Sequence, residues 1–229
     1  MSDIPNPKIS ADLKELSARV RRQDEDRWLA SRYAAPDVMD RVIITLAFII
    51  EMERTLTMSE PMIGRIRVQW WREALDEIFD QEKDVRAHEL TLAIADRLSD
   101  RPDLKEQFEK TMTAYEDVLD GAENAEYPPR IETGAQTANL VAKVIDRDSP
   151  ADEIEAVAQC GRAYVSARMG SPCAAPRIKL AKTAFRTVSS DFMAAIAHAA
   201  LSDTYVQSPT PGPLLKRWKI FKAVLTGKI

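Results

Sequence analysis

Glycine and long apolar runs are both scarce in this chain. Only seven of its 229 residues are glycine, whereas Ala, Leu, Glu, Arg and Met are abundant, so residue propensities favour helix almost throughout. The apolar run over residues 42–50 ends at Glu51 after nine residues, far short of the ~20 that cross a bilayer. We therefore predict an all-α fold without a transmembrane helix.

Cysteine and histidine are also rare. Cys160 and Cys173 lack partners at metal-ligand spacing, so we expect two reduced thiols in a cytoplasmic protein. Residues 1–7 have neither a basic start nor an apolar segment, and we expect no signal peptide. His88 and His198 stand alone, and no glycine-rich phosphate loop is present, so nothing predicts nucleophilic catalysis or a nucleotide site.

Acidic residues are missing from the C-terminal end. The whole chain carries a formal charge of −4, yet residues 204–229 contain five basic residues and no Asp or Glu. An acidic surface makes nucleic acid an unsuitable partner for the rest of the chain. Because 45% of the residues are apolar, a chain of this length can bury one substantial core. We expect one helical domain over residues 1–207 and a Pro-rich linker with a basic amphipathic helix over 208–229.

Apolar periodicity and capping residues give the expected helices. The second is apolar on every side between residues 42 and 50, which predicts a central helix surrounded by others. Pro61 follows Ser59 and Glu60 as an N-terminal proline that opens the third helix. The expected helices span residues 10–34, 37–57, 59–80, 88–99, 104–120, 131–145, 151–168 and 178–203, followed by the tail from 214.

An arginine lies within an apolar helical stripe in the third helix. Ile63, Ile66 and Trp70 fan across one side, and Arg67 projects from the centre of that fan. A guanidinium never loses its proton in a protein, so a buried Arg67 needs an anion. Glu51 on the antiparallel second helix can supply it as a structural pair, or a ligand can. The candidate ligand-binding or buried polar residues are Glu51, Arg67, Gln69, Trp70, Trp71 and Arg72, of which the tryptophans are more typical of core.

Several acid pairs stand one helical turn apart, which is the spacing that holds Mg²⁺ against a diphosphate. In a chain with 36 acids such spacing arises often by chance, and these residues lie on polar faces. We therefore predict no metal site and no catalytic residue from them. The pairs are Asp76/Asp80, Asp80/Asp84, Asp96/Asp100 and Asp148/Asp152.

The tail is a basic amphipathic helix. Leu214, Trp218, Phe221 and Leu225 align on one side, with basic residues around the remainder. This pattern is typical of a helix on an anionic membrane surface, and equally of a last helix that docks on the core. The predicted membrane or partner contacts are Lys216, Arg217, Trp218, Lys219, Phe221 and Lys222.

With these residues identified, the chain resembles the squalene/phytoene synthase family. The resemblance is particularly to a divergent branch that includes a mitochondrial complex I assembly factor and related bacterial proteins. It is strongest over residues 26–80 and looser at 88–98, 161–164 and 213–229. The segments that carry it are Asp26-Arg-Trp-Leu-Ala-Ser-Arg-Tyr33, Arg41, Leu46-Ala-Phe48 with Glu51, and Ser59-Glu-Pro-Met-Ile-Gly-Arg-Ile-Arg-Val-Gln-Trp-Trp-Arg-Glu-Ala-Leu75.

The resemblance implies an isoprenoid-synthase-like helical bundle around a cavity that receives prenyl diphosphates, here shortened in its C-terminal half. Active members use aspartate-rich motifs on two facing helices to bind Mg²⁺ and the diphosphate. The first motif should follow Phe48 closely, but residues 51–57 contain no aspartate, and Arg54 stands there. The second should follow residues 161–164 by about two turns, where Arg168-Met-Gly-Ser-Pro172 has no acid.

We therefore expect a degenerate synthase-like protein without cofactor that works by binding or as an assembly factor. Its expected partners are a membrane respiratory complex or an anionic membrane surface, with a peripheral location on the inner membrane, and a prenyl diphosphate or lipid as ligand. Two alternatives remain open. One is an active prenyltransferase that uses Mg²⁺ and relocated acids such as Asp76, Asp80 or Asp84. The other is an isoprenoid or lipid carrier.

Overall fold

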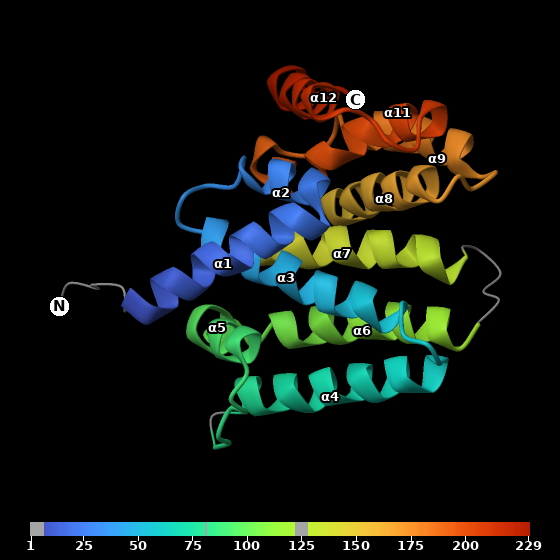
Figure 1. Cartoon of the computed structure of the whole chain (residues 1–229). Coiled ribbons are helices and arrows are strands. Elements are labelled where there is room, and N and C mark those ends of the chain that lie inside the picture. The colour runs from blue at the N-terminus through green and yellow to red at the C-terminus, as the bar shows by residue number, and fades with distance from the viewer. Residues whose placement is uncertain (1–6, 81, 122–127) are drawn as a thin grey trace.

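The computed structural model describes residues 7–80, 82–121 and 128–229, and all regular structure in them is helical. The predicted all-α class is therefore confirmed (Figure 1). The bounds are α1 Pro7–Gln23, α2 Glu25–Ser31, α3 Met39–Thr55, α4 Pro61–Phe79, α5 Glu89–Leu98, α6 Leu104–Leu119, α7 Pro129–Ile145, α8 Ala151–Arg168, α9 Ala174–Ala184, η1 Ser190–Phe192, α10 Met193–Ile196, η2 Ala197–Leu201, α11 Ser202–Gln207 and α12 Pro213–Thr226.

Helix α3 is the centre of the bundle, as its continuous apolar run predicts. Residues 42–52 of this helix are all buried, and α3 packs against α1, α2, α4, α5, α6 and α7. Figure 1 shows α4, α6, α7 and α8 stacked in that order, with α4 at one edge and α12 beyond the other. None of the helices in the described residues combines the length and apolar character of a membrane span.

Two expected helices are broken, and in both places a side-chain cap starts a new segment. The helix expected over 10–34 stops at Gln23, because Asp24 caps α2 by accepting the backbone N–H of Arg27 at 3.2 Å. The helix expected over 178–203 starts earlier, at Ala174, and stops at Ala184. A short 3₁₀ turn then begins after Ser189, whose hydroxyl accepts the backbone N–H of Asp191.

Helix α4 is rotated from the orientation that its isoleucines suggest. Ile63 and Ile66 are 45% and 63% exposed, whereas Val68 is fully buried. The cause is Gly64, where a Cβ atom would lie 2.6 Å from the carbonyl oxygen of Thr55. The end of α3 approaches α4 so closely that only a glycine fits between them. The prediction that Arg67 lies at the centre of a buried stripe is therefore wrong, since 39% of its side chain is exposed.

Two glycines set the spacing of α7 and α8. A Cβ on Gly134 would lie 2.4 Å from the carbonyl oxygen of Gly161, and a Cβ on Gly161 would lie 2.2 Å from that of Gly134. The helix backbones therefore touch at this crossing, and neither can accept even a methyl group without separating. The crossing fixes the position of the last two turns of α8, which carry Tyr164 and Arg168.

We predict that Gly161→Ala lowers the free energy of unfolding by about 1–3 kcal/mol, because the added methyl group forces two backbones apart. Urea unfolding measures the effect. Gly212→Ala is the matched control, because nothing lies within 4 Å of a Cβ at Gly212, and it should leave stability unchanged or slightly raised. Equal stability of the two variants would show that the α7–α8 crossing can accept a methyl group without loss.

Candidate functional site

The carboxylate of Glu51 is buried at the junction of three helices. Its side chain is 2% exposed, and Oε2 lies 2.6 Å from Nη2 of Arg67, so the predicted pair is present. Oε1 accepts a hydrogen bond from Nη1 of Arg54 at 2.7 Å and lies 3.8 Å from Nη1 of Arg19. One carboxylate thus faces cations from α1, α3 and α4, and it ties these helices together.

The other predicted residues of α4 point in different directions. Trp71 is buried and meets Phe48 edge-on, with ring centroids 5.5 Å apart, so it belongs to the core. Trp70 is partly buried and lines a shallow apolar groove of about 370 Å³ that Arg67 also borders. Arg72 turns toward α6, where it contacts Glu109 and Glu116, and Gln69 is exposed. A ligand-binding role for these residues stays a prediction.

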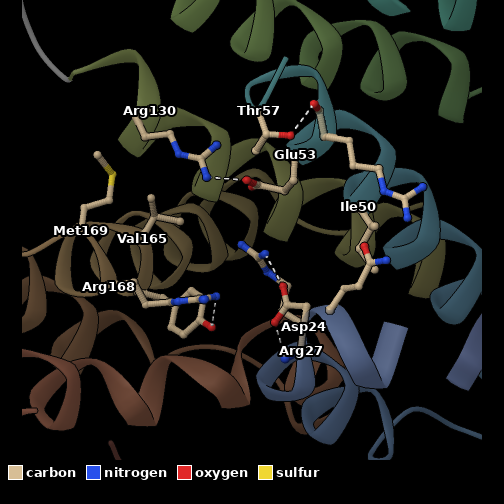
Figure 2. Close-up of a pocket in the computed structure, with 12 residues that line it drawn as sticks. Asp24, Arg27, Ile50, Glu53, Thr57, Arg130, Val165, Arg168 and Met169 are labelled. Atoms are coloured by element: carbon tan, nitrogen blue, oxygen red, sulfur yellow. Dashed lines mark hydrogen bonds and ion pairs between the residues drawn. The ribbon is translucent and has the colours of Figure 1, made fainter. Parts of the chain in front are cut away.

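A larger and strongly charged pocket lies on another side of α3. Its volume is about 410 Å³, and its walls come from the α1–α2 junction, the last turns of α3, the first turn of α7 and the end of α8. In Figure 2 the side chains of Arg27, Arg130 and Arg168 approach the same space from three helices. The lining residues are Gln23, Asp24, Arg27, Ile50, Glu53, Arg54, Thr57, Arg130, Tyr164, Val165, Arg168 and Met169.

Both carboxylates of this pocket already have partners. Asp24 accepts a hydrogen bond from Nη1 of Arg27 at 2.7 Å. Burial opposes ionisation of Asp24, but the charges of Arg27 and Arg168 more than offset it, so the pKa of Asp24 is lowered. Glu53 accepts hydrogen bonds from the hydroxyl of Tyr115 at 2.7 Å and from Nη2 of Arg130. Neither acid is left free to bind a cation.

Arg168 occupies the mouth of the pocket and is exposed to solvent. Its Nη1 donates to the hydroxyl of Tyr164 at 3.1 Å, and its guanidinium lies over the rings of Tyr164 and Tyr205. Burial raises the pKa of Tyr164 well above its ordinary value, so that hydroxyl stays neutral. Arg168 forms no salt bridge with a carboxylate of the described residues, and its interaction with Asp24 is a longer-range electrostatic one.

The pocket joins the two segments in which the resemblance places metal-binding aspartates. Glu53, Arg54 and Thr57 come from the first segment, and Arg168 and Met169 come from the second. Mg²⁺ prefers several free oxygen ligands, whereas this lining has four guanidinium groups and two carboxylates that are both paired. The residues present do not fit magnesium. Across the described residues, no cluster of three His, Cys, Asp or Glu residues suits a metal ion.

The acids named for a relocated metal site lie elsewhere. Asp76 is paired with Lys105 at 2.7 Å and Asp80 with Lys83 at 3.2 Å. Asp84 is exposed, and none of the three lines the charged pocket. The structure therefore does not bring these three acids to the charged pocket, where the ends of α3 and α8 lie.

A buried polar network links the pocket to the C-terminal helix. Asp26 is 2% exposed, and it accepts hydrogen bonds from the hydroxyls of Tyr164, at 2.8 Å, and Tyr205. Lys216 of α12 completes the network, with Nζ 2.9 Å from Oδ1 of Asp26. Burial lowers the pKa of the neighbouring His198 to about 3, so this ring is neutral and adds no charge. The ammonium group of Lys216 therefore points into the bundle and pairs with a buried carboxylate.

Helix α12 docks on the bundle by a face other than its aromatic one. Ile220 and Ala223 are buried, and α12 packs on η2 and α2. The predicted apolar side points outward, since Leu214, Trp218, Phe221 and Leu225 are all exposed. Arg217, Lys222 and Lys228 are exposed beside them, and Lys219 is half-buried. An unpartnered apolar and cationic surface results.

Sequence reasoning missed Arg27, Glu53, Arg130 and Tyr164 as pocket residues. The available signal was the pair of arginines, Arg54 and Arg168, in the two segments where acids were expected. The contributions of α2 and α7 depend on tertiary packing and left no local pattern.

We predict that Lys216→Met lowers the free energy of unfolding by about 3 kcal/mol, because it leaves the buried carboxylate of Asp26 without its cation. Asp26→Asn with Lys216→Met should cost less than the sum of the single changes, as urea unfolding of the full cycle measures. Lys222→Met, on the exposed side of the same helix, is the control and should change stability by less than about 0.5 kcal/mol. Additive losses would contradict the pair.

Comparison with known proteins agrees with this architecture. Residues 20–164 match the family model described as squalene/phytoene synthase. This match covers more than half of the chain, including α2, α3, α4 and most of α8. No curated protein and no solved structure matches the chain. The chain belongs to the squalene/phytoene synthase family.

Proposed function

We propose that this protein is a family member that does not ionise prenyl diphosphates and works by binding. The observation that carries the proposal is the presence of Arg54 and Arg168 in the pocket, one in each segment where the resemblance places metal-binding aspartates. In active members, Mg²⁺ between those acids and the diphosphate helps the leaving group depart. A guanidinium in the same place repels a divalent cation and offers hydrogen bonds instead.

The paired state of the remaining acids supports the same function. Glu53 could bind a metal only after losing Arg130 and the hydroxyl of Tyr115, and Asp24 only after losing Arg27. Each loss would leave a guanidinium without its anion in a partly buried site, which is costly. Electrostatic stabilisation of developing charge is usually the largest catalytic contribution, and these residues do not supply it through a metal.

We predict no release of inorganic pyrophosphate above background when the full-length protein is incubated with farnesyl or geranylgeranyl diphosphate and Mg²⁺. The physical reason is the lack of free carboxylates at the pocket. An active synthase of the family, assayed in parallel, is the positive control. Magnesium-dependent release that Arg168→Gln abolishes would establish the alternative, an active prenyltransferase.

We further propose that the protein is peripheral on the inner membrane, bound to an anionic lipid surface through α12. The outward face of this helix combines exposed Trp218 and Phe221 with Arg217 and Lys222, as membrane-surface helices do. The resemblance to the branch with a complex I assembly factor supports a role beside a membrane respiratory complex.

We predict that Trp218→Ser with Phe221→Ser weakens binding to vesicles rich in phosphatidylglycerol by roughly tenfold or more, because two aromatic side chains no longer enter the interface. Vesicle cosedimentation measures the binding. The matched control is Ile63→Ser with Ile66→Ser, which removes two equally exposed apolar side chains from α4 and should change nothing. Unchanged vesicle binding by the α12 variant would contradict α12 as the membrane contact. An equal loss of binding in the α4 variant would contradict it as well.

A further inference from the structure

The charged pocket carries more positive charge than its own acids neutralise. Arg27, Arg54, Arg130 and Arg168 line it, against Asp24 and Glu53. Arg54 is paired with Glu51, which is not part of the pocket lining. Arg168 makes direct contacts with Tyr164 and Tyr205 and interacts with Asp24 only at longer range. An excess of guanidinium groups around one cavity favours an anion.

Hydrogen-bond donors at the same pocket lack acceptors. Nε of Arg27 and Nη1 of Arg130 are both buried without a hydrogen-bond partner. The side chain of Arg27 is only 6% exposed, so solvent reaches it poorly. A buried donor without an acceptor costs about 1–3 kcal/mol, and native structures rarely leave such a donor unused. Both atoms belong to residues that line the cavity, and both can donate to the acceptor oxygens of a ligand bound there.

We propose that this pocket binds a phosphate monoester or diphosphate group directly through Arg27, Arg130 and Arg168, without a divalent cation. The proposal rests on the binding function above and names the chemistry of the ligand. A guanidinium presents parallel N–H groups that match two oxygens of one phosphate. Arg27 and Arg130 are paired with Asp24 and Glu53 but keep further N–H groups for phosphate oxygens. Arg168 adds a positive charge that no salt bridge neutralises, and a guanidinium stays charged at every physiological pH.

The walls of the pocket indicate that the phosphate carries an apolar chain. Ile50 and Val165 border the charged groups, and Met169 stands exposed at the rim. The volume of about 410 Å³ accommodates a diphosphate and the first few carbons of a chain, but a complete long chain would extend beyond it. A prenyl diphosphate and a phosphatidic acid share this chemistry.

The test is isothermal titration calorimetry of the full-length protein with pyrophosphate, farnesyl diphosphate and a short-chain phosphatidic acid, each in EDTA and again in excess Mg²⁺. We expect binding in EDTA that Mg²⁺ leaves unchanged or weakens, because the ion competes for the same phosphate oxygens. The tightest of the three probes identifies the source of the phosphate group. Absence of binding by all three, or a requirement for Mg²⁺, overturns the proposal.

Variants at the mouth of the pocket assign the site. Arg168→Gln should weaken binding at least tenfold in EDTA, and Arg168→Lys should recover part of the loss because it keeps the charge. The matched control is Arg65→Gln, which removes a partly exposed arginine that pairs with Asp120 at the end of α6 and does not line the pocket. Equal affinity of the Arg168 and Arg65 variants overturns the proposal. The assay for pyrophosphate release tests only whether the protein is catalytic. The proposed function and the proposed phosphate site can therefore fail separately.

Discussion

The permanent charge of arginine is the constraint on which this structure depends. A guanidinium that leaves water must meet an anion or an electron-rich surface, and the helices are arranged so that most do. Glu51 receives Arg54 and Arg67 and ties α3 to α4. Arg72 joins α4 to α6 through Glu109 and Glu116. Arg168, at the mouth of the charged pocket, forms no salt bridge with the described residues and instead lies over the rings of Tyr164 and Tyr205.

Helix α8 connects the two surfaces to which we assign function. Its crossing with α7 at Gly161 fixes the helix axis, Tyr164 then reaches the buried carboxylate of Asp26, and Arg168 opens to the pocket one turn later. On the other side of Asp26, Lys216 holds the first turn of α12. Helix α12 and the pocket therefore share one buried network, and under our proposals a phosphate ligand would bind within a few side chains of the lipid surface.

The sequence predicts the fold class and most helix ends, because apolar periodicity and prolines act locally. It also offers Glu51 as one of two possible anions for Arg67, because antiparallel neighbouring helices can bring the two residues together, and the structure contains that pair. Prediction from the sequence fails where contacts between helices determine which side chains are buried and where a helix ends. Gly64 turns Ile63 and Ile66 outward by letting α3 approach, and Asp24 interrupts a helix that propensity alone would continue. The pocket draws Arg27 and Arg130 from helices far apart in sequence, which no local pattern reveals.

The most direct measurement of the central claim is an anomalous difference map from crystals of the full chain soaked in tungstate, with EDTA present. Tungstate has the shape and charge of a phosphate group and scatters strongly. We predict the highest peak between Arg168, Arg130 and Arg27. The absence of a peak in this pocket, or a peak that appears there only after Mg²⁺ is supplied, would contradict the claim that arginines replace the metal ions of the family.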